Sequence, residues 1–455
     1  MKTTLLGLAA KFIHPSMAIY TLSSYCQTQG IENISLLDLT INHNLDFVVA
    51  EIYRENPDIL GISCYIWNID MVSKILAILR ETKPNMKIIL GGPEIDAELP
   101  NADYFVIGEG EEVLVQLIKD IMAGREDIPT VYSSEVKLPL GLNPFIHDTF
   151  PLEMFDNKIL YYETSRSCPY SCSYCLYGND NSLLFLDLER VKKELKFYLD
   201  RGVKQVKFLD RSFNARRSHA MEIWQFLIDN DNGVTNFHFE IYPDLLSEEL
   251  FEVLNTVRPG QFQFEIGVQS TNRETLKLVK RRTNLDRAIA NIKKIPRSIH
   301  VHLDLIAGLP GEGYASFRNS FNDVYALKPE MLQLGFLKVL KNTSLDKETE
   351  QYGIVYNKFA PFTTLYTNDI TYDEMMKLRS VERVLNLYYN TEGYFKEKLE
   401  RCEALFDTPF DFYENLAVYY EGRKWHWASH KKVTLDGFLD EYLADVHGVA
   451  VRIEE

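Results

Sequence analysis

Short apolar runs alternate with amphipathic segments over residues 1–125 of the chain. The runs have the length of buried strands, and the segments between them place apolar residues at helical spacing. Several helical segments stop at a glycine or a proline, as at Gly30, Pro57 and Pro84. This alternation predicts a Rossmann-like parallel sheet with helices between its strands. The predicted strands are 3–8, 34–37, 59–62, 87–90 and 104–107.

A second series of strand and helix patterns begins at residue 159 and runs to about residue 345. Its strand patterns recur at intervals that leave room for a helix between each pair. Six units predict a partial (β/α)6 barrel, because a closed barrel of this kind has eight. The predicted strands are 159–164, 205–209, 236–241, 261–266, 299–305 and 331–337.

Two further segments lack this alternation. Residues 126–158 contain prolines and little periodicity, so we expect a linker there. Residues 346–455 are rich in aromatic side chains and carry helical patterns at 372–389, 395–406 and 434–446, which predict a helical C-terminal cap. The sequence therefore predicts an α/β protein of three parts: a Rossmann-like domain, a partial barrel and a helical domain.

The composition is that of a globular protein, with 46% hydrophobic and 25% charged residues among 455. The net charge of −16 disfavours a nucleic-acid partner, which needs a basic surface. No apolar stretch reaches the roughly 18 residues that a membrane span requires, and the N-terminus lacks the pattern of a signal peptide. We therefore expect a cytoplasmic protein without a membrane partner.

Three of the six cysteines lie within one short segment, directly after the first predicted barrel strand. Cys168, Cys172 and Cys175 would thus sit at the carboxyl end of that strand, where barrels of this type place active sites. Thiolates bind iron–sulfur or zinc centres, and three of them leave a four-coordinate site one ligand short. A zinc site completed by Cys402 or a histidine is the alternative, but the spacing differs from the paired motifs of zinc ribbons.

The segment Ser165–Cys175, with its CxxxCxxC spacing, resembles the motif of the radical S-adenosylmethionine (SAM) superfamily. The resemblance implies a [4Fe-4S] cluster on the three cysteines, with SAM bound at the remaining iron and Tyr174 beside its adenine. Segments on later strands are similar to family motifs, among them GVQS and DLIAGLPGE. They imply SAM contacts at Asp210, Glu240, Gln269, Asp304 and either Arg282 or its neighbour Arg281.

The N-terminal domain lacks the GxGxxG glycines of a dinucleotide site. Ser63, after the third predicted strand, and Gly91 with Gly92, after the fourth, resemble the serine and paired-glycine positions of cobalamin-binding domains. Glu109 lies in a GEGE segment that is similar to one common in cobalamin-binding radical SAM proteins. Tyr65 and Trp67 offer aromatic surface either for a corrin face or for ordinary packing against the barrel. His14 lacks the aspartate and glycine of the DxHxxG motif, so we expect cobalamin bound base-off, with a non-coordinating side chain below it; a structural role for His14 is the simpler interpretation.

Together these segments are similar to one branch of the cobalamin-domain radical SAM proteins, whose C-terminal domain has no assigned role. The resemblance implies an enzyme that cleaves SAM reductively to a 5′-deoxyadenosyl radical, with a flavodoxin or ferredoxin as electron donor. C-methylation of an unactivated carbon in a small molecule or peptide is the leading hypothesis.

Other functions stay open. They are a cobalamin-assisted radical rearrangement or redox reaction without methyl transfer, and a non-catalytic electron carrier or sensor. Methylthiolation of tRNA would need further cluster cysteines, which Cys26 and Cys64 do not supply. A tail segment containing Trp425, His426, Trp427 and His430 could line a substrate pocket or simply be packed.

Overall fold

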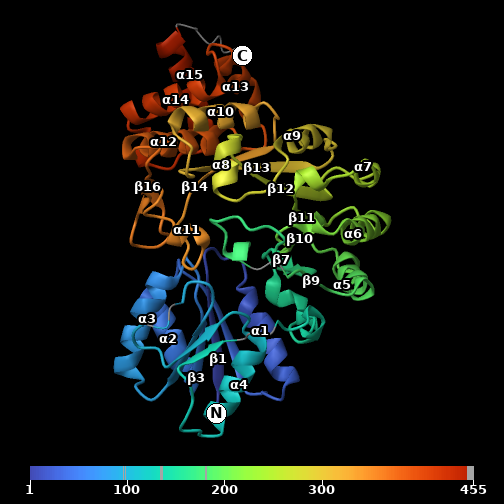
Figure 1. The fold of residues 1–455 in the computed structure, drawn as a ribbon, viewed down its shortest axis with the longest axis vertical. Coiled ribbons are helices and arrows are strands. Elements are labelled where there is room, and N and C mark those ends of the chain that lie inside the picture. Colours follow the sequence, from blue (N-terminus) through green and yellow to red (C-terminus); the bar gives the residue numbers. More distant parts are fainter. Residues whose placement is uncertain (96, 98, 134–136, 180–181, 448–455) are drawn as a thin grey trace.

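The computed structural model describes residues 1–455 except 96, 98, 134–136, 180–181 and 448–455. The N-terminal domain lies at one end of the molecule, the barrel in the middle and the C-terminal helices at the other end (Figure 1). Within the described part of the chain, every helix is too short or too polar to cross a bilayer.

The N-terminal domain is a parallel sheet of six strands in the order β2-β1-β3-β4-β5-β6. Helices α1 and α4 pack together, as do α2 and α3. Every residue of β1 is buried, as expected for a central parallel strand covered on both faces. The elements are β1 (Thr3–Ala9), α1 (Met17–Thr28), β2 (Ile34–Thr40), α2 (Leu45–Glu55), β3 (Ile59–Ser63), α3 (Ile69–Thr82), β4 (Lys87–Gly91), β5 (Tyr104–Ile107), α4 (Glu111–Met122) and β6 (Val131–Ser133).

The strand order places a topological switch between β1 and β3, because the chain turns to opposite sides of the sheet after these two strands. Ligands of such sheets bind beside the carboxyl ends of the strands at this point. The structure adds β6 to the five predicted strands, within the stretch expected to be a linker. Three residues are too few to give a periodic signal.

The second sheet is also parallel, in the order β14-β13-β12-β11-β10-β7. Among the described residues no pairing joins β7 to β14, so the barrel is open, which confirms the predicted partial barrel. Its strands are β7 (Leu160–Tyr162), β10 (Gln205–Phe208), β11 (Asn236–Glu240), β12 (Phe262–Gln269), β13 (His300–Ala307) and β14 (Met331–Phe336). Its helices are α5 (Leu188–Asp200), α6 (Arg217–Asp229), α7 (Glu248–Leu254), α8 (Arg273–Leu278), α9 (Leu285–Lys294) and α10 (Tyr314–Tyr325).

The two faces of the barrel sheet differ in polarity. One set of alternating side chains is aromatic and fully buried with Trp224 of α6, including Phe208, Phe237, Phe239 and Phe264. The other set is polar, because successive residues of a strand point to opposite faces of the sheet. These polar residues include Lys207, His238, Glu265 and His302. The aromatic set packs beneath the helices, which leaves the polar set on the inside of the barrel.

The described part of the C-terminal domain is helical, as predicted, and adds helices α11 and α14 and a small hairpin to the three predicted helices. Helix α12 packs on β14 and α14, and α14 packs on α10, so the helices lie on the barrel away from the N-terminal domain (Figure 1). The elements are α11 (Ser344–Lys347), β15 (Val355–Tyr356), β16 (Thr364–Tyr366), α12 (Tyr372–Tyr388), α13 (Lys396–Glu403), α14 (Pro409–Gly422) and α15 (Lys432–His447).

The aromatic tail segment is divided between packing and solvent. Trp425 stacks on Phe438 with ring centroids 3.7 Å apart, and His430 Nε2 lies 2.8 Å from the Trp425 carbonyl oxygen. Trp427 is 72% exposed. The contacts of Trp425 and His430 fit local packing.

Candidate functional site

The three cysteines follow β7 on a loop that also forms the short hairpin of β8 (Ser165–Arg166) and β9 (Leu184–Phe185). Cys168 and Cys172 are buried and Cys175 is partly exposed. Cys168 Sγ lies 3.5 Å from Ser212 Oγ, and Cys172 Sγ lies 3.8 Å from Tyr242 Oη. The loop therefore holds its thiols against residues that follow β10 and β11, at the carboxyl end of the barrel.

Asp210 anchors the start of this loop. Its Oδ2 accepts a hydrogen bond from the Thr164 amide at 2.9 Å, and its Oδ1 accepts from the hydroxyls of Thr164 and Ser165, each at 2.6 Å. His219 of α6 lies 2.9 Å from the same Thr164 hydroxyl. Asp210 is fully buried, and burial raises its pKa to about 6. We expected Asp210 to contact SAM; in the structure both of its carboxylate oxygens accept hydrogen bonds from the start of the cysteine loop.

Arg281 is the arginine that reaches the cysteines. Its Nη1 donates to Tyr242 Oη at 2.9 Å and Tyr174 Oη at 3.4 Å, and lies 3.8 Å from Cys172 Sγ. Its Nη2 donates to the Gly267 carbonyl oxygen. Arg282 is exposed. Of the two arginines that the motif left open, the structure brings only Arg281 to the cysteines.

Gln269 and Glu240 lie at the ends of neighbouring strands. Gln269 has a φ of 72°, and its Oε1 is buried without a hydrogen-bond partner. Glu240 lies 3.7 Å from the Arg211 guanidinium, and burial raises its pKa. Asp304 instead lies beside His302 inside the barrel, with 3.1 Å between Oδ1 and Nε2. Gln269 and Glu240 are thus available to a ligand at the mouth, whereas Asp304 belongs to another cluster.

The spacing of the thiols bears on the metal they could hold. Ligands of a single zinc ion lie close together, since zinc–sulfur bonds of roughly 2.3 Å place sulfurs about 4 Å apart. Among the described residues, the three cysteine sulfurs do not all lie within 4.8 Å of one another. Ligand atoms of Glu265, His302 and Asp304 do. The donor set and its wider spacing fit an iron–sulfur cluster better than the zinc alternative.

The carboxyl ends of β1 and β3 form the candidate site of the N-terminal domain. Ser63 is buried, and its Oγ has no hydrogen-bond partner. Trp67 is 42% exposed and stacks on Tyr65 with centroids 4.4 Å apart and planes 4° apart. The indole Nε1 donates to the Leu8 carbonyl at 2.9 Å, which ties the stack to the end of β1. An unpaired hydroxyl and an exposed aromatic face thus lie together at the topological switch.

Gly91 and Gly92 end β4 beside this stack. Gly92 has a φ of 113°, and a Cβ there would overlap the backbone of Cys64. A Cβ at Gly91 would meet only Val106, at 3.7 Å. The turn therefore requires a glycine at position 92, whereas Gly91 borders open space. The described residues therefore fit the cobalamin tail that the resemblance implies.

His14 and Glu109 face the barrel instead. His14 Nδ1 lies 2.6 Å from Tyr161 Oη of β7, and burial lowers the pKa of His14. Glu109 accepts from the Leu138 amide and lies 3.4 Å from Arg166, which also pairs with the buried Glu111 at 2.9 Å. Both residues join the two domains.

Arg166, three residues after Glu163 and two before Cys168, was missed because a lone arginine in a loop carries no pattern.

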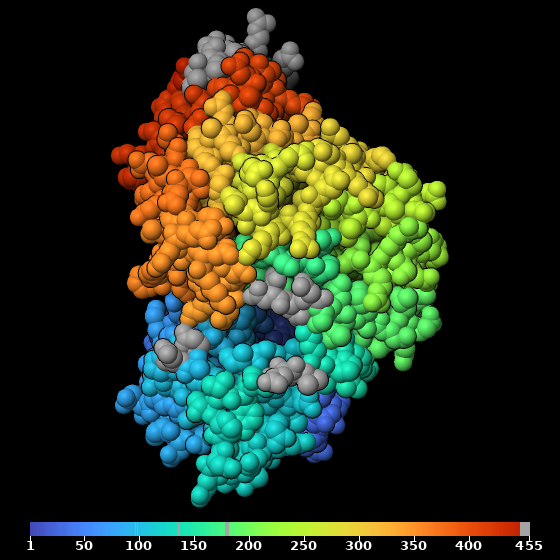
Figure 2. Space-filling view, viewed as in Figure 1, coloured from blue at the N-terminus to red at the C-terminus, as the bar shows by residue number. Residues whose placement is uncertain are grey.

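The surface is hollowed between the blue and cyan N-terminal domain and the green part of the barrel (Figure 2). The strands β1 and β3 belong to the first of these parts, and β7, β10 and β11 belong to the second. Two candidate sites, one on each domain, thus share one interdomain region.

Family models cover most of the chain. The model of the B12 binding domain matches residues 3–118, and that of the Radical SAM superfamily matches residues 162–324. Residues 350–452 match a family described as a protein of unknown function (DUF4080). These three ranges correspond to the two sheets and the C-terminal helices.

Two curated relatives are methyltransferases. The 2-(S-pantetheinyl)-carbapenam-3-carboxylate methyltransferase of Streptantibioticus cattleyicolor is 25% identical over 309 residues, which cover 59% of this chain and 45% of that protein. TokK of Streptomyces tokunonensis, a cobalamin-dependent radical SAM methyltransferase, is 25% identical over 342 residues, covering 66% and 50%. The chain spans about half the length of these relatives.

Solved structures share the fold. OxsB, a cobalamin-dependent SAM radical enzyme solved with aqua-cobalamin and SAM, superposes with a TM-score of 0.66 at 16% identity, over 100% of this chain and 76% of that one. TsrM of Kitasatospora setae, solved with cobalamin and a [4Fe-4S] cluster, gives a TM-score of 0.64 at 18% identity, over 79% and 76%. Successive parts of the chain thus match the models of the B12 binding domain, the Radical SAM superfamily and the DUF4080 family.

Proposed function

We propose that this protein is a cobalamin-dependent radical SAM enzyme that methylates an unactivated carbon of a small molecule or peptide. The observation that carries the proposal is the loop of Cys168, Cys172 and Cys175 at the barrel mouth, next to the B12-binding domain. When bound, the [4Fe-4S] cluster, SAM and cobalamin supply an electron, a 5′-deoxyadenosyl radical and a methyl group. The residues of the chain bind and orient these groups and exclude water.

Four residues at the mouth suit SAM. The guanidinium of Arg281 lies 3.8 Å from Cys172 Sγ, next to the place of the proposed cluster. It would therefore pair with the carboxylate of SAM bound to that cluster. Glu240 would accept from the amine or ribose hydroxyls, and the unpaired Gln269 Oε1 supplies a further acceptor. Tyr174 would lie beside the adenine, held there by its hydrogen bond with Arg281.

The N-terminal residues suit cobalamin bound without a histidine ligand. His14 is engaged with Tyr161, so it is not free to reach a cobalt ion from the switch point. The hydroxyl of Ser63 and the space at Gly91 would receive the nucleotide tail. The stacked pair of Tyr65 and Trp67 would cover one corrin face, because a flat aromatic surface packs well on a macrocycle.

The reductant would come from outside the chain. Burial raises the pKa values of Cys26, Cys64 and Cys402 to about 12, so these thiols are poor ligands for a second cluster. An external one-electron donor such as a flavodoxin or ferredoxin would therefore reduce the cluster.

The experiment follows the methyl group of SAM. Anaerobic protein is reconstituted with iron, sulfide and hydroxocobalamin, reduced, and incubated with methyl-labelled SAM. We expect label in the protein-bound corrinoid fraction, and none when cobalamin is omitted from the reconstitution. If cobalamin binds and 5′-deoxyadenosine forms while the corrinoid stays unlabelled, the methyltransferase assignment fails and radical chemistry without methyl transfer takes its place.

A further inference from the structure

Glu94 is a buried carboxyl group that the chain leaves without a hydrogen-bond partner. The residue follows β4, two positions after Gly92, and is 1% exposed. Among the described residues, it is the one buried carboxyl group of which neither oxygen has a hydrogen-bond partner. Burying a polar group without a partner costs free energy, so such an exception calls for an explanation. The proposed function gives Glu94 no role.

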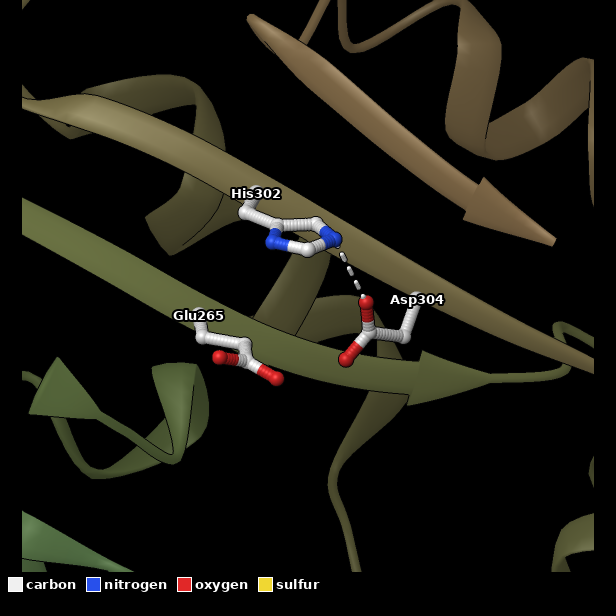
Figure 3. Close-up of side chains that lie close together, drawn as sticks. All are labelled: Glu265, His302 and Asp304. Carbon is white, nitrogen blue, oxygen red and sulfur yellow. Dashed lines mark ion pairs between the residues drawn. The ribbon is translucent and has the colours of Figure 1, made fainter. Parts of the chain in front are cut away.

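Other carboxyl groups in the interior have partners within the chain. In the barrel, Asp304 forms an ion pair with His302, with 3.1 Å between Oδ1 and Nε2 (Figure 3). The fully buried Glu312 accepts hydrogen bonds from the hydroxyls of Ser270 at 2.6 Å and Ser320 at 2.8 Å. The chain thus satisfies these acids with its own side chains, unlike the acid after β4.

The backbone places Glu94 at the candidate cobalamin site. Its N–H donates to the Cys64 carbonyl oxygen at 3.4 Å, and the Cys64 N–H donates to the Gly91 carbonyl oxygen at 2.7 Å. Cys64 directly follows Ser63, whose buried Oγ also lacks a hydrogen-bond partner. Unsatisfied polar side chains therefore follow or end two neighbouring strands, β3 and β4, where Gly91 borders open space.

The charged groups that act on Glu94 come from the segment around α11. Burial raises the pKa of Glu94; the positive charge of Lys341 opposes this increase and the negative charge of Asp346 adds to it. The Leu345 amide of α11 donates to the Ser173 carbonyl oxygen of the cysteine loop at 2.8 Å. Glu94 thus lies where the N-terminal domain faces α11 and the cysteine loop (Figure 1).

Given the proposed function, on which this inference rests, we propose that Glu94 is a cobalamin-binding residue whose carboxyl oxygens accept hydrogen bonds from the cofactor. Cobalamin offers N–H donors on the amide groups around its corrin ring and an O–H donor on the ribose of its nucleotide tail. A carboxyl group accepts through both oxygens, so these donors satisfy the atoms that the chain leaves unpaired.

One substitution separates a ligand contact from a structural role. Methionine is close to glutamate in volume and removes both acceptors. In Glu94→Met without cobalamin, the free energy of unfolding should be unchanged or higher, because an unsatisfied buried group is gone. The affinity for cobalamin should fall, because the cofactor loses a partner. If Glu94 only supported the fold, for example through the charge of Lys341, the stability would fall and the affinity would stay.

Hydroxocobalamin is the probe, measured by its absorbance in equilibrium dialysis against the full-length protein with its reconstituted cluster. We expect an affinity at least about tenfold weaker in Glu94→Met, and a smaller loss in Glu94→Gln, whose amide oxygen is still an acceptor. Glu32→Met removes an exposed carboxylate of the same domain, and this matched control should keep the wild-type affinity.

Cobinamide distinguishes the two kinds of donor, because it has the corrin amides but lacks the nucleotide tail. The loss in Glu94→Met persists with cobinamide if the amides bind Glu94, and it disappears if the ribose does. Either result supports a contact between Glu94 and the cofactor.

Equal affinity of the wild type and Glu94→Met for hydroxocobalamin overturns the proposal. So does a lower free energy of unfolding in Glu94→Met, because the carboxyl group would then support the fold. If the wild type binds cobalamin, Glu94→Met binds it more weakly and no methyl label enters the corrinoid, only methyl transfer fails. A wild type that does not bind cobalamin contradicts both the proposed function and the role of Glu94.

Discussion

Single side chains decide which groups meet at the barrel mouth. The motif leaves two consecutive residues, Arg281 and Arg282, as candidates for the arginine at the barrel mouth. The sequence does not show which of the two side chains points inward from the turn after α8. Burial and contacts settle this, because Arg281 bonds Tyr242 and Tyr174 while Arg282 is exposed. Asp210 lies at the end of a strand, where we expected a contact with the ligand. In the structure its carboxylate accepts three hydrogen bonds from Thr164 and Ser165.

Replacing Arg281 by lysine should lower the rate of SAM cleavage by more than about tenfold. A lysine cannot serve Tyr242, Tyr174 and the Gly267 carbonyl at once, and it offers no planar pair of donors to a carboxylate. The assay is 5′-deoxyadenosine formation by reduced protein. Arg282→Lys is the matched control, and equal losses in the two variants would contradict the assignment.

His219 gives the loop anchor a defined pH dependence. Burial, with a smaller effect of Arg216, lowers the pKa of His219 to about 4, below its ordinary value of 6.5. Between pH 4 and 6.5 the unfolded chain therefore binds the extra proton, so the stability contributed by neutral His219 is complete above pH 6.5 and is lost as the pH falls. The difference is at most about 3 kcal/mol.

Denaturant unfolding of the wild type and His219→Gln at several pH values measures this contribution. The free energy of unfolding of the wild type relative to the variant should rise between pH 4 and 6.5 and then level off. A difference that is constant across this range, or that falls, would show that His219 is not held neutral by its surroundings.

At the scale of elements, the sequence predicted well wherever an apolar period ran for several residues. Helices α12 and α15 and most strands of both sheets agree with the predicted ranges to within a few residues. Helix α14 was missed although its buried residues Phe410, Tyr413, Ala417 and Tyr420 recur at helical spacing. The start signal was present, since Thr408 caps the helix and Pro409 begins it.

The end of β4 offers a paired test of structure and ligand binding. Gly92→Ala should destabilise the N-terminal domain by about 1–3 kcal/mol, because its φ of 113° and the Cys64 backbone exclude a side chain. Gly91→Ala should leave the stability nearly unchanged, since Val106 at 3.7 Å makes an ordinary contact.

Cobalamin binding separates the two glycines further. If the cofactor tail occupies the space at Gly91, the Gly91→Ala variant folds normally but retains less cobalamin after gel filtration, as its absorbance reports. Full retention of cobalamin by this variant would place the tail elsewhere.

At the scale of the whole molecule, the N-terminal domain meets the barrel through residues after β1 and β5 and through β7 and the residues on either side of it. Glu109 and Glu111 of the first domain pair with Arg166, which lies on the loop that carries the cysteines. His14 contacts Tyr161 of β7, and Lys158 pairs with Asp38 at 2.7 Å. A single sequence carries no signal for contacts between residues so far apart along the chain. The sequence therefore predicted the two domains but not the contacts that join them.

The proposed function makes one requirement of the cysteine loop: its three thiols must hold the cluster while one iron remains open to SAM. The Cys172→Ala variant tests the requirement against Cys402→Ala, which removes a buried thiol far along the chain. The measurement is 5′-deoxyadenosine released by anaerobic, reduced protein given SAM. We predict release by the wild type and Cys402→Ala and none by Cys172→Ala; release by Cys172→Ala at the wild-type rate would contradict the account.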